Sequence, residues 1–460
     1  MASPFGMVVR KQLLESFGSA RFMVAVLLCM TVGVGATVIR TQAYQSSLAI
    51  YRLNRIQHGA EAKSYKGPYR LTYSGVSLDK RPVLLGIFYG GLEPTRPMTV
   101  RITANRDPQT VDQHEQANPI AELFQAVDLM WFTMVVMSLL ALVFSYDLVS
   151  GEKETGTLRL TFSHPMPRSQ LLLGKWVGGY LSLGLPFILT ALCSLGVVAF
   201  ALGSEVGSGD LAGYALLMLS GLLYTGAFFS IGLFVSSRTH RSFTSITVLV
   251  AVWAGATLAV PHLSPYVARL LVRLPTIQEV ERDKWAVARA EDERRGSRSR
   301  EYRSATTDSE VQQGVVTSEF WRDSFLQIAL RQEQIQSDYE RRVDDQIQVA
   351  SWLARVSPAS SLIFASGQVT DTGVRQLRAF RRDLQGYRIQ FLNYAEDKWI
   401  ERVRQGGGEI STEDYPRFVR FRTGLGDRVA ATLPDLALLG LWNVIFFAAA
   451  YVGFLRYDVR

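Results

Sequence analysis

Cysteine and histidine are scarce in this sequence of 460 residues. The two cysteines, Cys29 and Cys193, lie inside apolar runs, and the five histidines show no ligand spacing such as H-x-x-x-H. A disulfide framework needs several cysteines at regular spacing, and a zinc site needs clustered ligands. The sequence therefore predicts neither a disulfide-stabilised fold nor a metal site.

Nucleotide-binding and catalytic motifs are also missing. No G-x-x-x-x-G-K-[ST] stretch occurs, and Gly406-Gly407-Gly408 is not followed by a helix start with Lys and Ser or Thr. Such a chain cannot cradle ATP phosphates in the manner of a P-loop. No Ser/His/Asp constellation stands out, so we do not expect an enzyme, and a membrane-embedded enzyme is the least favoured function.

Charged residues are absent from the middle of six long apolar runs. About 20 apolar residues suffice to cross the hydrocarbon of a bilayer, where a charge is costly. The mean hydropathy of +0.10 indicates that substantial polar mass accompanies these spans. The net charge of +8 comes mainly from arginines spread among acidic residues, so we do not expect nucleic-acid binding. The predicted spans are 21–40, 126–146, 174–202, 211–236, 242–261 and 434–455.

The first run could be read as a cleaved signal peptide, because Arg10 and Lys11 precede it. It is longer than a usual signal-peptide core and five more runs follow, so an uncleaved anchor is the better interpretation. Lys and Arg gather in the loops 147–173 and 237–241 and in the tail 456–460, whereas the loop 203–210 has none. The positive-inside rule then places both termini in the cytoplasm.

Two long insertions are expected on the outer side. The first, 41–125, begins with a helical stripe and continues with alternating stretches at 69–73 and 98–102, which predict a small α/β module. The second, 262–433, carries apolar stripes at 311–347 and 374–399, which predict two long helices packed antiparallel across a short linker around Pro358 and Gly367. Between them, 290–309 is expected to be a solvated loop, with a contact site for an acidic partner as the alternative.

The loop between the second and third spans carries the most informative motif. It reads E-K-E-T-G-T-L from Glu152 to Leu158, then P-M-P-R from Pro165, with Gly174-Lys175 at the start of the next span. On pattern alone, an ordinary surface loop and a functional turn with paired carboxylates are equally good interpretations. The string E-x-E-x-G-T-L, followed by P-x-x-R and G-K, closely resembles the cytoplasmic coupling segment (147–173) of ABC-2 type permeases, a group related to the copper-enzyme maturation permeases.

This resemblance implies a fold and a set of partners. The fold is mainly α, a six-transmembrane-helix ABC-2 permease of the type V exporter-like class with a small α/β and a larger helical extracytoplasmic insertion. The segment 1–20 is similar to the family's cytoplasmic amphipathic helix, and 353–393 resembles a DUF3526-type domain. In this family the coupling segment docks on the ATP-binding subunit, which implies that role for Glu152, Glu154, Gly156, Thr157, Leu158, Pro165 and Arg168.

The expected partners are two copies of an ABC ATP-binding subunit that hold the ATP and Mg²⁺, a second copy of this permease or a related one, membrane lipid, and an extracytoplasmic protein. The expected location is the bacterial cytoplasmic membrane. The favoured function is ATP-driven export or extraction of an amphipathic, lipid-like or peptide cargo, because the spans lack the ionisable groups that ion coupling needs. The alternative is a platform that relays ATPase motion to an outer protein without transport.

Overall fold

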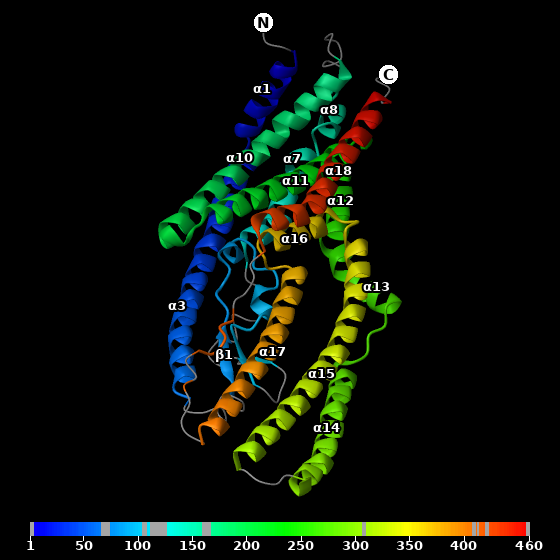
Figure 1. Cartoon of the computed structure of the whole chain (residues 1–460). Coiled ribbons are helices and arrows are strands. Elements are labelled where there is room, and N and C mark those ends of the chain that lie inside the picture. The colour runs from blue at the N-terminus through cyan, green and yellow to red at the C-terminus, as the bar shows by residue number, and fades with distance from the viewer. Residues whose placement is uncertain are drawn as a thin grey trace.

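The computed structural model describes residues 4–65, 74–103, 108–110, 127–158, 167–305, 310–406, 411, 414–418 and 423–456. The described chain is mainly helical. Both ends of the chain lie at the same end of the molecule, and a region of long helices and a small sheet lies at the other (Figure 1). We call this second part the distal region: the end of α3 (Gly35–Lys63) beyond residue 47, the sheet, and helices α14 (Ile277–Ala305), α15 (Glu310–Ala354) and α17 (Val374–Arg404).

Six helical stretches of the described chain are long and apolar enough to cross a membrane, which confirms the predicted number of spans. Three of them contain a π-helical segment. In chain order they are α2 (Ala20–Leu28), η1 (Cys29–Val34) and α3 (Gly35–Lys63); α6 (Leu129–Phe132), η5 (Thr133–Met137), α7 (Ser138–Ser145) and α8 (Ser150–Glu154); α10 (Arg168–Leu202); α11 (Ser208–Arg238); α12 (Ser242–Trp253), η7 (Ala254–Ala259) and α13 (Val260–Leu271); and α18 (Leu425–Leu455).

Small residues let the helices approach closely. Lipid tails are as apolar as the side chains, so membrane helices associate through close packing and not through a hydrophobic driving force. Helix α1 (Pro4–Phe17) packs along the start of α10, where a Cβ on Gly178 would lie 2.8 Å from the Cβ of Gln12. A Cβ on Gly232 of α11 would overlap Ser145 Oγ of α7. Side chains at these positions would push the helices apart.

The segment expected to be a short linker around Pro358 is instead a buried helix, α16 (Pro358–Val369), which packs against both α11 and α18. Its N-cap Ser357 accepts a hydrogen bond from the Ala359 amide (3.1 Å) and donates one to the Ala256 carbonyl of η7. The prediction was wrong because α16 is rich in Ala and Ser. Those residues give no apolar periodicity, yet their small size allows close packing.

The distal sheet is small and antiparallel, in the order β1 (Val76–Asp79), β2 (Thr99–Ile102), β3 (Gln109–Thr110). Val76 pairs with Ile102, and Val100 pairs with Thr110. The strand predicted at 98–102 is confirmed, whereas the one predicted at 69–73 lies outside the described residues. One face of the sheet forms an apolar cluster with α3 and α17, in which Phe391 and Ile102 are fully buried. The short 3-10 helices η2 (Leu84–Ile87) and η3 (Glu93–Thr95) join β1 to β2.

Three long helices extend from the bundle: α14 (Ile277–Ala305), α15 (Glu310–Ala354) and α17 (Val374–Arg404). Helix α15 packs against α17, as the apolar stripes predict, and also against α14 (Figure 1). The solvated loop expected at 290–309 is wrong for 290–305, which belong to α14; residues 306–309 lie outside the described part. Arg, Glu and Ala are good helix formers, and pairs such as Glu291–Arg294 (3.7 Å) add support at the spacing of one helical turn.

Candidate functional site

The polar turn, residues 146–158, joins α7 to the segment before α10 and contains most of the motif. Its short helix α8 lies against the C-terminal end of α11. Ser236 Oγ of α11 accepts hydrogen bonds from the backbone amides of Val149 (3.1 Å) and Ser150 (3.0 Å). Those amides begin a helix and have no partner within it, so one hydroxyl satisfies two donors that would otherwise be costly to bury.

Glu152 is half-buried and forms an ion pair with Lys175 of α10, with 2.7 Å between Oε2 and Nζ. Lys175 is almost completely buried and also donates to the Leu148 carbonyl (2.7 Å). A buried ammonium requires a carboxylate and further acceptors, because its desolvation is expensive. Glu152 therefore fixes α8 to the third span.

Lys153 and Glu154 bind the ends of two other spans. Lys153 Nζ donates to the carbonyls of Ser237 (2.5 Å) and Thr239 (3.2 Å), at the C-terminal end of α11. Glu154 Oε2 accepts from the Ser242 amide (3.0 Å), at the N-terminal end of α12. A cation at a helix C-terminus and an anion at a helix N-terminus both oppose the end charges of the helix dipole. The two residues thus hold the fourth and fifth spans at their junction.

Two arginines complete these connections. Arg21, at the start of α2, pairs with Asp147 (2.8 Å), donates to Tyr146 Oη (2.9 Å) and lies over the Tyr146 ring. Arg168, at the start of α10, donates to the Leu455 carbonyl (2.9 Å) at the C-terminal end of α18. The polar turn is thus bonded directly to the first, third, fourth and fifth spans, and Arg168 connects the third span to the sixth.

The exposed tip of the polar turn, residues 154–157, is its outward-facing part. Gly156 has φ of +74°, a left-handed conformation that favours glycine, and Thr155 and Thr157 hydrogen-bond through their hydroxyls (2.9 Å). Leu158 is buried in the bundle core and fixes the tip from below. The tip is thus a short exposed surface with a fixed backbone conformation, and Leu158 and the bonds to the spans hold it in place.

The motif residues therefore divide into two groups. Glu152 and Arg168 bind within the chain, Glu154 does so while remaining exposed, and Gly156 and Thr157 face outward. Pro165 lies outside the described residues. Sequence analysis missed Lys153, Asp147 and Ser236, which carry much of the network. Sequence patterns gave little indication of these residues, because the partner of a polar loop residue lies on another span and is known only from the folded structure.

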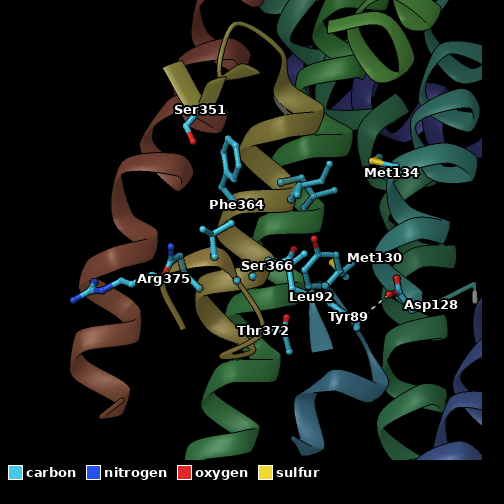
Figure 2. Close-up of a pocket in the computed structure, with 18 of the residues that line it drawn as sticks. Tyr89, Leu92, Asp128, Met130, Met134, Ser351, Phe364, Ser366, Thr372 and Arg375 are labelled. Carbon is cyan, nitrogen blue, oxygen red and sulfur yellow. Dashed lines mark hydrogen bonds between the residues drawn. The ribbon is translucent and has the colours of Figure 1, made fainter. Parts of the chain in front are cut away.

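A cavity of about 540 Å³ lies between the distal region and the bundle, remote from the polar turn. Its walls come from the end of the first span, the 89–94 segment, the start of the second span, the end of α15, α16, and the start of α17. Figure 2 shows Phe364, Ser366 and Thr372 between Arg375 on one side and Met130 and Asp128 on the other. Sequence analysis missed this cavity, because its lining is spread over residues 40–378.

Hydrogen bonds join the two walls below the cavity. Arg96, fully buried, donates to the carbonyls of Asp371 (3.2 Å) and Gly373 (3.2 Å), and the Leu92 amide donates to Thr372 (3.0 Å). These bonds connect the segment before β2 to the turn between α16 and α17. The walls that Leu92 and Thr372 contribute to the cavity are therefore held together by the fold.

Asp128 occupies one wall and is buried. Its carboxylate accepts from the amides of Trp131 (2.7 Å) and Gly90 (3.0 Å), so it caps α6 and fixes the 89–94 segment. Burial raises the pKa of the Asp128 carboxyl above its ordinary value, while the two amides and the nearby Arg40 guanidinium act to lower it. Its hydrogen bonds give it a structural role.

Four arginines line the cavity, and two of them are paired. Arg355 makes a two-point contact with Asp435 of α18, with 2.7 and 3.2 Å between the nitrogens and the carboxylate oxygens, and lies over the Phe364 ring. Arg378 pairs with Asp344 of α15 (2.8 Å). Arg40 donates to the Gly86 carbonyl (2.8 Å), and Arg375 forms no ion pair with any residue that the structure describes.

Among the described residues, no three His, Cys, Asp or Glu side chains gather where they could hold a metal ion.

Comparison with known proteins identifies the family. The family model described as "ABC-2 family transporter protein" matches residues 7–459, nearly the whole chain. The chain belongs to the ABC-2 transporter family. As a member of that family it is a membrane-embedded permease, which agrees with its six apolar helices.

Two curated relatives match part of this ABC-2 permease. Each is named "Probable ABC transporter permease protein NosY": one from Stutzerimonas stutzeri is 32% identical and one from Pseudomonas aeruginosa is 34% identical, each over 119 residues. The matched stretch covers 26% of this chain and 43% of either relative. The resemblance to ABC-2 permeases in the sequence is thus confirmed, whereas the DUF3526-type assignment stays a prediction.

Proposed function

We propose that this chain is the permease subunit of an ATP-driven transporter and that a separate ATP-binding subunit docks on the exposed tip, residues 154–157. The observation that carries the proposal is the arrangement of the polar turn. Its outward face offers Thr155, Gly156 and Thr157 in a fixed shape, and its inward face is bonded to four spans. One short segment therefore offers both a surface for a partner and direct bonds to the membrane spans.

This arrangement suits the transmission of force. A push on the tip reaches the third span through Glu152 and Lys175, the fourth through Lys153, and the fifth through Glu154. Packed helices change position as rigid bodies, because their interfaces are close-packed and do not deform continuously. ATP-driven closure of two ATP-binding subunits, which hold the ATP and Mg²⁺, would rotate spans in a dimer of this permease or in a pair with a related one.

The same part of the molecule supports an orientation. The polar turn, the 237–241 loop and both termini lie at one end, and that end carries basic residues such as Arg238, Arg241 and Arg456, so we propose that it faces the cytoplasm of a bacterium and that the distal region lies outside the inner membrane. The distal region would then meet the cargo or an outer protein. A mainly apolar bundle favours a lipid-like, amphipathic or peptide cargo.

The docking proposal is tested with a bulky substitution on the tip. Thr157→Trp should abolish co-purification with the ATP-binding subunit and cargo-dependent ATPase activity, because an indole there covers the proposed contact surface. Ser46→Trp, on an exposed position of α3 away from the tip, should leave both unchanged. Charge reversal at Glu152 and Glu154 is a poorer test, because both carboxylates bind within the permease.

Equal co-purification and ATPase activity in the tip variant and the Ser46 variant would refute docking at the tip. Transport is a separate measurement: ATP-dependent flux of an amphipathic probe in proteoliposomes supports a transporter, whereas ATPase activity stimulated by an outer protein without flux contradicts transport.

A further inference from the structure

We propose that the cavity between α15, α16, α17 and the start of α6 binds an anionic amphiphile, a molecule with an acyl chain and a carboxylate or phosphate headgroup. The proposal rests on the proposed function for its biological meaning, since it names the cargo class of the permease. The binding itself can be tested without the ATP-binding subunit.

One part of the cavity is apolar. Met130 and Met134 come from the second span, and Leu362 and Phe364 from α16. Methionine side chains are flexible and fill irregular spaces, so they suit an acyl chain of variable conformation. Ligand sites of this kind have mostly apolar walls with a few polar groups that fix orientation.

The polar part carries a positive charge that the described chain does not neutralise. Arg355 and Arg378 are balanced by Asp435 and Asp344, and the carboxylate of Asp128 lies near Arg40. Arg375 is exposed at the side of the cavity opposite Asp128 and has no carboxylate partner among the described residues (Figure 2). An arginine fork is the preferred partner of carboxylate and phosphate.

A second group is also unsatisfied. Ser366 lines the cavity and is fully buried, and its Oγ has no hydrogen-bond partner in the part of the chain that the structure describes. A buried hydroxyl without a partner is costly, and a ligand oxygen within reach would remove that cost. The neighbouring hydroxyls of Thr370 and Thr372, in contrast, bond to each other at 2.7 Å.

The cavity lies at the level where a membrane amphiphile places its headgroup. Arg40 follows the first apolar run, and Asp128 immediately precedes the second span, so both mark the boundary of the apolar layer. The methionines lie on the membrane side of that boundary. The cavity volume of about 540 Å³ suits a single chain or the upper part of a lipid.

The test uses the full chain in phosphatidylcholine nanodiscs and the probe dansyl-undecanoate, whose fluorescence shifts to the blue in an apolar site. A saturable component is expected above partition into the lipid. Arg375→Glu should weaken it by about tenfold or more, because a charge-assisted contact is replaced by repulsion. Ile363→Trp, which fills the cavity, should abolish it. Arg382→Glu, at an exposed position of α17 outside the cavity, should leave it unchanged.

Four outcomes would overturn the proposal: no saturable component, equal binding of the uncharged methyl ester of the probe, equal loss in the Arg382 variant, or full displacement by inorganic phosphate, which would indicate a site for a free anion. Failure of the docking proposal is seen elsewhere, in co-purification of tip variants. If the Thr157→Trp variant still binds the probe saturably, the cavity proposal stands even if the docking proposal fails.

Discussion

The polar turn and the cavity are both rich in charge, but they use it differently. In the polar turn, Asp147, Glu152, Lys153 and Glu154 each bind an identified group of another span. In the cavity, two arginines are paired, while Arg375 and the Ser366 hydroxyl have no partner among the described residues. Satisfied groups hold a structure together, whereas unsatisfied groups in a built cavity point to a ligand. Charge content alone does not separate the two roles.

Removal of Asp435 should have the largest effect on stability. Asp435 is almost fully buried and holds Arg355, whose side chain is 27% exposed. Asp435→Ala leaves that guanidinium without its carboxylate, which should cost about 3 kcal/mol. Thermal unfolding of the full chain in detergent measures the loss. The control is Asp427→Ala on the exposed first turn of the same helix, which should change the midpoint much less.

The Arg375→Glu variant gives the contrasting case within the cavity. It should unfold at the wild-type temperature but bind the dansyl probe weakly. If Arg375→Glu unfolds early and Asp435→Ala does not, the division between structural and ligand-binding arginines is wrong.

The second prediction concerns the polar turn. Glu152→Gln should destabilise the chain by about 2 kcal/mol, because Lys175 stays buried without a counter-charge. The double variant Glu152→Gln with Lys175→Met should regain much of that loss, since removing both charges also removes their desolvation cost. The four chains of this cycle are compared by thermal unfolding. Additive losses would mean that the pair contributes no coupling.

The smallest effect is expected for a pair on the surface of the distal region. Asp414 accepts a hydrogen bond from Tyr394 (2.6 Å) and pairs with Lys398 (3.0 Å), which together hold the pKa of its carboxyl below the ordinary value. Because the folded-state pKa is depressed, this contribution is present above the unfolded pKa of about 4 and is lost as the pH falls below it.

Asp414 is 64% exposed, so the contribution is small. Asp414→Asn should lower the unfolding midpoint slightly at neutral pH, and the gap to wild type should close on acidification. A gap that widens in acid would contradict the assigned sign.

Sequence patterns predicted what depends on local composition. The six spans, the strand at 99–102, and the apolar stripes of α15 and α17 follow from hydropathy and periodicity. Helix α16 could not be found in this way, because Ser360, Ser361 and Ala365 look like a loop until α11 and α18 enclose them. The motif from Glu152 to Leu158 was recognisable, but the direction in which Glu152 faces depends on Lys175, which lies 23 positions later in the chain. The cavity depends on contacts among segments far apart in sequence.

The first span carries a mechanical consequence. Helix α2, η1 and α3 form one continuous helical rod of 44 residues, from Ala20 to Lys63. At 1.5 Å per residue the rod is about 66 Å long. Arg21 ties its beginning to the polar turn, and His58, near its other end, bonds to Asp79 of the sheet (2.9 Å). A tilt of about 5° at the polar turn would displace the far end of such a rod by roughly 6 Å. If the polar turn moves as proposed, the rod would act as a lever that turns a small angular change at its start into a displacement of the sheet at its far end.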